Sequence, residues 1–273
     1  MPAAVPGRRE VRHIVDVVMR RQLPDTADLI SPETLVPPES ATRVLVVMAH
    51  PDDVDYGAAG TVARWVRQKR SVTYCVVTDG DAGHTDPAVD RAALAETRRR
   101  EQREAARLVG VEDVRFLGLP DGLVEPGPAL RRDVARIIRQ VRPHLVLTHS
   151  PDRNHVRIKS SHPDHRAVGA ATLDAVYPDA RNPCAFPELL LDEGLQAWTV
   201  PEVWLRGGPV ADRFVDVTDT FDLKMAAIRA HRSQGGAEPG FDEVMRGRLA
   251  TLAAEAGLPE GRLCEAFQVV DTA

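Results

Sequence analysis

The sequence predicts an α/β protein built on a mostly parallel sheet with helices on both faces. Short apolar runs rich in β-branched residues, such as residues 44–48, alternate with longer segments of helical periodicity. Runs that are apolar throughout are typical of strands covered on both faces. Polar residues follow these runs directly, where an open α/β sheet presents the carboxyl ends of its strands. Together these observations predict a Rossmann-like single domain with a decorated C-terminal part.

Composition sets further limits. With 273 residues and 43% hydrophobic content, the chain can bury a sizeable core. A net charge of -5 argues against a nucleic-acid binder. The apolar runs fall far short of the ~20 residues that a membrane helix needs, and the N-terminus lacks the pattern of a signal peptide. The three cysteines form neither a C-x-x-C pair nor a disulfide framework, which fits a cytoplasmic protein. A homo-oligomer is compatible with all of this.

Residues 1–40 are expected to form an N-terminal helical extension, and residues 41–273 the main domain. Apolar residues recur at helical spacing between positions 11 and 19, and a proline-rich connector follows them. Neither segment carries residues that suggest chemistry.

The first half of the main domain alternates strands and helices. The expected elements are a strand at 44–48, a helix ending at Arg70, a strand at 72–77, a helix at 92–109, a strand at 114–117, a helix at 130–141 and a strand at 145–148. Pro51 ends the first strand, because proline cannot donate to a sheet. Gly110 stands where a helix C-terminus favours glycine, and Pro143 stops the third helix. This alternation is typical of a parallel sheet.

The second half is less regular. It begins with a polar loop at 149–161, an alanine-rich helix at 167–176 and an irregular stretch at 178–187. Late strands are expected at 203–205 and 214–217, and Asp219 or Thr220 is expected to cap the helix that runs to about residue 231. A helical tail and a last strand at 267–270 complete the decorated part.

Two pairs of metal-binding residue types lie at strand ends. His50 and Asp53 are three residues apart on one turn, and His162 and His165 are three apart at the start of a helix. Catalytic zinc takes about three nitrogen or oxygen ligands and keeps a position for water. Two loops at one sheet edge could therefore converge on one ion. Asp52 points differently from Asp53 and is free to hold a water, a division of roles that suits hydrolysis.

Each motif alone also fits a structural role. The His-Pro-Asp-Asp turn could be an Asx-type turn, and the His-Pro-Asp-His segment could be a helix N-terminus with Asp164 in its first turn. The two motifs together favour a functional site, because both follow predicted strands and packing requires none of their polar residues.

Two functions other than this hydrolysis also match part of the pattern. A two-metal phosphoesterase would space its ligands His-x-Asp-x-Asp, but Val54 occupies the last of these positions. A non-enzymatic nucleotide-binding module would use glycine-rich loops, and the chain has glycines at 57 and 60 and at 80 and 83. Neither pair forms a G-x-G-x-x-G or P-loop pattern, so phosphate binding is weakly supported.

The two motifs resemble those of the PIG-L/LmbE-like family of zinc-dependent N-acetylglucosaminyl deacetylases. The family's Ala-His-Pro-Asp-Asp turn stands at residues 49–53 and its His-Pro-Asp-His segment at 162–165, and the resemblance extends from about Arg43 to the C-terminus. It implies that His50, Asp53 and His165 bind one Zn²⁺ per chain, or another divalent ion.

The same resemblance assigns the remaining roles. It implies that Asp52 is the general base, that His162 is the acid or oxyanion stabiliser, and that Arg98 and Asp121 meet sugar hydroxyls. We expect Asp164 to support the ligands without binding the ion. The implied reaction removes an acetyl group from an N-acetylglucosamine-type amide, a small-molecule sugar conjugate. A mycothiol-type S-conjugate amidase is the close alternative.

The chain departs from the family pattern at two places. Val54 follows the paired aspartates where the family has an acid, and Asp55 comes one residue later. Ser160 stands where some relatives place a tyrosine that donates to the oxyanion. A late segment, residues 231–234, also resembles a family motif, without an assigned role.

Overall fold

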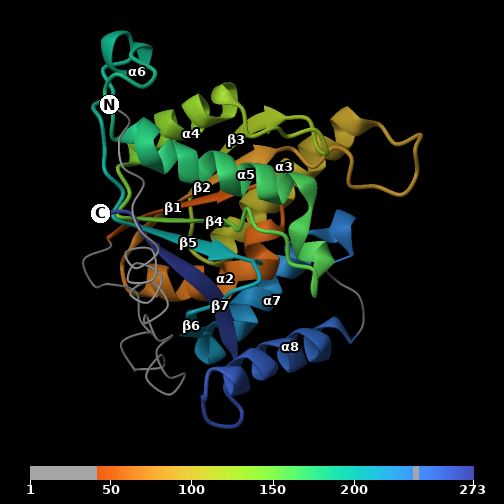
Figure 1. Ribbon diagram of the computed structural model, residues 1–273. Helices are drawn as coiled ribbons and strands as arrows, with labels where there is room; N and C mark the ends of the chain where they lie inside the picture. Colours follow the sequence, from red (N-terminus) through yellow and green to blue (C-terminus); the bar gives the residue numbers. More distant parts are fainter. Residues whose placement is uncertain (1–41, 236–239) are drawn as a thin grey trace, which may run out of the picture.

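A seven-stranded sheet forms the centre of the fold, with the strand order β3-β2-β1-β4-β5-β7-β6 (Figure 1). The computed structural model describes residues 42–235 and 240–273. Its strands are β1 (Arg43–Met48), β2 (Ser71–Thr78), β3 (Asp113–Leu119), β4 (Leu145–His149), β5 (Glu202–Arg206), β6 (Arg213–Asp216) and β7 (Cys264–Asp271). Strands β3, β2, β1, β4 and β5 pair in parallel, and β7 runs antiparallel to both β5 and β6. The predicted mostly parallel α/β fold is confirmed.

Helices cover both faces of the sheet (Figure 1). They are α2 (Asp53–Arg67), α3 (Arg91–Leu108), α4 (Pro128–Val141), α5 (Pro163–Asp174), α6 (Glu188–Leu191), α7 (Phe221–Ala230) and α8 (Phe241–Glu255), with short helical turns η2 (Ile158–Ser161), η3 (Ala175–Ala180), η4 (Thr218–Thr220) and η5 (Arg232–Gln234). Val44 and Val46 of β1 pack toward α2, α3, α7 and α8, and Leu45 and Val47 pack toward α4 and α5. This two-sided burial explains why β1 is apolar at every position.

The strand order places a crevice between β1 and β4. From β1 the chain proceeds outward to β2 and β3, and it then returns to β4 on the other side of β1. Loops that leave the carboxyl ends of β1 and β4 therefore separate at this point, which is where open α/β sheets bind ligands. Residues 49–53 follow β1, and residues 150–161 follow β4.

Some predicted boundaries were wrong. His149, expected in the polar loop, is the last residue of β4 and is 1% exposed. Helix α5 begins at Pro163, four residues early, because His162 acts as its N-cap and accepts the Asp164 N–H. The Thr220 hydroxyl precedes α7 but donates to backbone carbonyls, so it caps no N–H group. The N-terminal extension lies outside the described residues, and the boundary at residue 40 stays a prediction.

A buried ion pair anchors the start of α2 to the C-terminal part of the chain. Lys224 of α7 and Glu265 of β7 lie 2.8 Å apart and are 0% and 2% exposed. The Lys224 ammonium also donates to the Asp55 and Tyr56 carbonyls, and the Glu265 carboxylate accepts the Thr61 N–H. The decorated C-terminal part therefore holds the helix that follows the first motif. None of the helices in the described ranges has the length and apolar character needed to cross a bilayer.

We predict that Leu147→Ala lowers the free energy of unfolding by about 2–5 kcal/mol, because it opens a cavity between the sheet and its helices. Leu147 lies in β4 and is 0% exposed. The matched control is Leu123→Ala, whose leucine is 74% exposed, and its effect should stay within about 0.5 kcal/mol. Urea unfolding followed by circular dichroism measures both. Equal losses would show that the β4 core does not carry the stability assigned to it.

Candidate metal centre and active site

The three predicted ligands meet at one point above the ends of β1 and β4. His50 Nδ1 lies 3.2 Å from Asp53 Oδ2 and 3.2 Å from His165 Nε2. Asp53 Oδ1 lies 3.0 Å from His165 Nε2. Ligand atoms of a tetrahedral zinc ion, each about 2.0–2.1 Å from the metal, stand about 3.3 Å apart. The donor atoms are thus spaced to fit one such ion.

The second ring nitrogen of each histidine has an acceptor of its own. His50 Nε2 lies 3.1 Å from Asp164 Oδ2 and 3.0 Å from Asp121 Oδ1, and His165 Nδ1 lies 3.2 Å from the Ser160 carbonyl. A histidine that donates one N–H in this way keeps the lone pair of its other nitrogen free for a metal. These contacts leave His50 Nδ1 and His165 Nε2 as the atoms that could bind a metal.

Charge at this point also suits a cation. Burial lowers the pKa of His50, but hydrogen bonds with Asp121, Asp164 and Asp53 outweigh burial and raise that pKa to about 12. Burial raises the pKa of Asp53, and the neighbouring histidines, His165 foremost, hold it well below its usual range. Three carboxylates around one imidazole favour a positive charge, which a divalent ion would supply in place of the proton.

His149 is a member of the cluster that sequence reasoning missed. Its Nε2 lies 3.3 Å from Asp53 Oδ2, and its ring stacks on His165 with centroids 4.1 Å apart. Burial lowers the pKa of His149 to about 3, so the ring is neutral. Among the described residues three overlapping groups could hold a metal, namely Asp53, His149 and His165; His50, His162 and His165; and His50, Asp121 and Asp164. The signal was the position of His149 directly after a predicted strand, like that of His50.

Asp52 has a strained backbone that turns its side chain away from Asp53. Its φ of 97° lies in the left-handed region, which costs about 1–3 kcal/mol for a residue other than glycine. Helix α3 holds this conformation: the Asp52 N–H donates to Gln102 Oε1 (2.7 Å), and Arg98 Nη2 donates to Asp52 Oδ2 (3.0 Å) and to the Pro51 carbonyl (2.7 Å). Burial raises the pKa of Asp52 to about 6, against the opposing charge of Arg98.

A cleft of about 370 Å³ opens over these groups. Seven of the eight predicted site residues line it, and the exception is Asp164, which is 0% exposed beneath His50. Arg98 reaches the cleft, but it is 3% exposed and its hydrogen bonds go to protein groups. A Cβ atom at Gly80 or Gly83 would overlap the Arg98 guanidinium. These two glycines therefore admit an arginine rather than a phosphate.

The displaced acid, Asp55, lies away from the ligands. It is 0% exposed, and its Oδ2 lies 2.9 Å from Gln102 Nε2 and 2.8 Å from His231 Nε2. Gln234 Nε2 donates to the Gly83 carbonyl at 3.1 Å. The late motif at residues 231–234 thus ties α2 and the Gly83 turn to the C-terminal part, which is the structural role that the sequence left unassigned.

Comparison with known proteins agrees with the geometry. The family model "PIG-L: GlcNAc-PI de-N-acetylase" matches residues 45–176, the segment that contains both motifs. A diacetylchitobiose deacetylase from Thermococcus kodakarensis is 31% identical over 70% of this chain and 70% of that protein. This chain belongs to the PIG-L family.

Two further PIG-L relatives extend the match. A 1D-myo-inositol 2-acetamido-2-deoxy-α-D-glucopyranoside deacetylase from Kineococcus radiotolerans is 34% identical over 85% of this chain and 79% of that protein. The solved structure of N,N′-diacetylchitobiose deacetylase from Pyrococcus horikoshii, in complex with an inhibitor, matches with a TM-score of 0.78 and 27% identity over 98% of this chain and 95% of that chain. The PIG-L family resemblance predicted from the two motifs is confirmed.

We predict that Asp164→Asn weakens metal binding by about 10–100-fold, because the carboxylate that orients His50 is lost. Asp164 also accepts the Gly122 N–H on Oδ2 and the Val124 N–H on Oδ1, and the amide can keep one of these two hydrogen bonds. Competition with a zinc-sensitive dye measures the affinity. Asp152→Asn, an exposed aspartate in the loop that follows β4, is the control and should match the parent. Unchanged affinity in Asp164→Asn would remove Asp164 from the support of His50.

Proposed function

We propose that this protein is a zinc-dependent hydrolase that removes the acetyl group from an N-acetylglucosamine-type amide. The observation that carries the proposal is the convergence of His50 Nδ1, the Asp53 carboxylate and His165 Nε2 within 3.2 Å of one another. Its support from relatives is that proteins at least 30% identical are named as deacetylases of acetylated amino sugars. The donor set of two imidazoles and one carboxylate fits a catalytic zinc site.

A divalent ion in this site would supply Lewis-acid chemistry, which polarises the amide and acidifies water. Asp52 takes the proton of the attacking water, because its carboxylate faces the cleft beside the ligands and is held by Arg98. Asp52 then passes that proton to the leaving amine, and His162 donates a hydrogen bond to the developing oxyanion. Its Nδ1 accepts the Asp164 N–H at 3.2 Å, so the ring carries its proton on Nε2. His162 also lines the cleft.

Arg98 and Asp121 stay the proposed contacts to the sugar hydroxyls. Both line the cleft, and a guanidinium and a carboxylate suit a ligand rich in hydroxyls. Each residue also contacts a group of the reaction centre. Arg98 holds Asp52, and Asp121 contacts His50 Nε2. Substitution of either residue would therefore affect the reacting groups as well as the sugar.

The alternative reactions have less support. An S-conjugate amidase of the mycothiol type would use the same ligands, but the named relatives are deacetylases. The phosphoesterase lacks its third spaced acid, because Val54 stands at that position and is buried in the first turn of α2. A nucleotide-binding module would need Gly80 and Gly83 to make room for a phosphate, but these glycines pack on Arg98.

We predict that the purified protein carries about one zinc-like ion per chain, because the described groups that could hold a metal all share residues with His50, Asp53 and His165. Elemental analysis by mass spectrometry measures the content. Chelation should abolish deacetylation and lower the melting temperature, and added zinc should restore both. Protein that is free of metal and gains neither activity nor thermal stability from zinc would end the hydrolase proposal.

We further predict different results for the two adjacent aspartates. Asp52→Asn should keep its metal and lose about 10²–10⁴-fold in kcat, because it removes a general base. Asp53→Asn should lose the metal, because it removes a ligand that two histidines contact. Metal content and release of free amine are measured on both variants. The reverse result, an empty site in Asp52→Asn and a filled one in Asp53→Asn, would exchange the two roles.

A further inference from the structure

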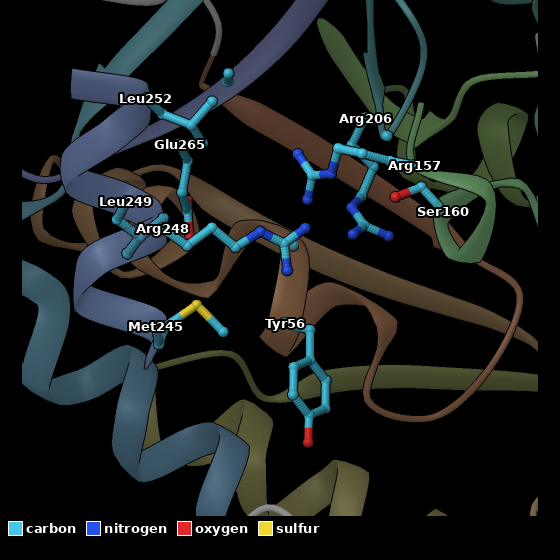
Figure 2. Close-up of a pocket in the computed structure, with 12 residues that line it drawn as sticks. Tyr56, Arg157, Ser160, Arg206, Met245, Arg248, Leu249, Leu252 and Glu265 are labelled. Carbon is cyan, nitrogen blue, oxygen red and sulfur yellow. The ribbon is translucent and has the colours of Figure 1, made fainter. Parts of the chain in front are cut away.

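Three arginines converge on a small cavity beside the metal centre (Figure 2). Arg206 ends β5, Arg157 precedes η2, and Arg248 belongs to α8. Figure 2 shows their guanidinium groups pointing toward one another across the cavity, although they come from segments far apart in the sequence. The cavity measures about 60 Å³ and is also lined by Tyr56 and Glu265.

No acid neutralises these arginines within residues 42–235 and 240–273, where none of the three forms an ion pair. Glu265 lies in the cavity wall, but its oxygens are engaged elsewhere. Oε1 pairs with Lys224 Nζ at 2.8 Å, and Oε2 accepts the Thr61 N–H at 2.8 Å. Three positive charges therefore face one space whose acid, Glu265, is shared with Lys224, an arrangement that raises the local potential and that an anion would relieve.

Arg206 is fixed in place by its surroundings. A Cβ atom at position 57 would overlap its guanidinium, so the absence of a side chain at Gly57 makes room for it. Its Nη1 lies 3.5 Å from His149 Nδ1, on the side of that ring opposite Asp53. Burial lowers the pKa of Arg206, which shows that its charge is held in a poorly solvated place. The planar fork of a guanidinium matches the oxygens of a phosphate or a carboxylate.

The cavity is continuous in its lining with the metal cleft. Lys159 lines both that cleft and a neighbouring groove of about 370 Å³. Arg157, Ser160 and Arg248 line both the groove and the arginine cavity. A path of positively charged side chains thus leads from the metal centre to Arg206.

We propose that Arg157, Arg206 and Arg248 bind one oxyanion group, a phosphate or a carboxylate, at a site distinct from the metal centre. A volume of about 60 Å³ admits a group of a few heavy atoms, since one water molecule takes about 30 Å³ in the liquid. The anion is either free in solution or the distal end of a substrate whose acetylated sugar occupies the metal cleft. The possibility that the substrate carries the anion rests on the proposed function.

The first test is calorimetric titration of inorganic phosphate into the full-length, metal-containing protein at constant ionic strength. The parent should bind phosphate saturably, and Arg157→Gln and Arg248→Gln should each weaken binding by about 10-fold or more, the worth of one charge-assisted hydrogen bond. Both arginines are exposed, so these variants should fold. Arg153→Gln, an exposed arginine on the same loop that lines none of the three cavities, should match the parent.

Three results would overturn the site. The first is a parent that does not bind phosphate saturably. The second is binding that Arg157→Gln and Arg248→Gln both leave intact, which would place the phosphate at the metal, and the third is equal weakening of binding by Arg153→Gln. The titration needs no deacetylase activity, so its outcome is independent of the proposed function.

A second experiment separates the two sources of the anion. Deacetylation is measured on N-acetylglucosamine conjugates with and without a terminal phosphate. If the substrate carries the anion, Arg248→Gln raises KM about 10-fold for the phosphorylated conjugate alone. If the anion is free in solution, added phosphate changes the rate at which the parent turns over the neutral conjugate. The same addition leaves the rate of Arg248→Gln unchanged. Equal kinetics of parent and variant under all these conditions would contradict a link between the arginine site and catalysis.

Discussion

The left-handed backbone at Asp52 is the constraint on which the site depends. Because the backbone at Asp52 is left-handed, the two adjacent carboxylates point in different directions. The Asp53 carboxylate lies toward His50 and His165, and the Asp52 carboxylate lies toward Arg98. Within the turn, the His50 N–H donates to Asp53 Oδ2 at 2.8 Å, but the contacts to Asp52 that hold its conformation from outside the turn are the larger part of its support. Helix α3 makes these contacts through Arg98 and Gln102, and the buried Lys224–Glu265 pair holds the start of α2 behind it. The rest of the fold therefore keeps one short turn in a shape that it would not adopt alone.

Electrostatics divides the sheet edge into two regions of opposite sign. Around His50 the carboxylates of Asp53, Asp121 and Asp164 outnumber fixed cations, and this excess suits a divalent ion. On the far side of His149, three arginines face a cavity whose acid, Glu265, is paired with Lys224. His149 stands between the two, neutral, with Asp53 on one ring nitrogen and Arg206 near the other. The two regions are adjacent, so a charge bound in one changes the electrostatic potential in the other.

Much of the fold could be predicted from the sequence, because burial on both faces leaves apolar runs that periodicity detects, as in β1 and β4. The two ligand pairs could be predicted too, since both follow strands. The support could not: Gln102 and Lys224 contact the first motif from 47 or more positions away along the chain, and no local pattern records such contacts. The family resemblance implies that Arg98 contacts the sugar, and only the tertiary fold shows that it also holds Asp52.

The central claim is that one metal ion is bound by His50, Asp53 and His165 and not by the overlapping group that contains His149. Anomalous diffraction from crystals of the zinc-loaded protein, collected at the zinc absorption edge, tests this most directly. The account predicts one peak per chain, about 2.0–2.2 Å from His50 Nδ1, an Asp53 oxygen and His165 Nε2, and beyond bonding distance of His149. A peak bonded to His149 with His50 left out, or no peak at this edge of the sheet, would contradict it.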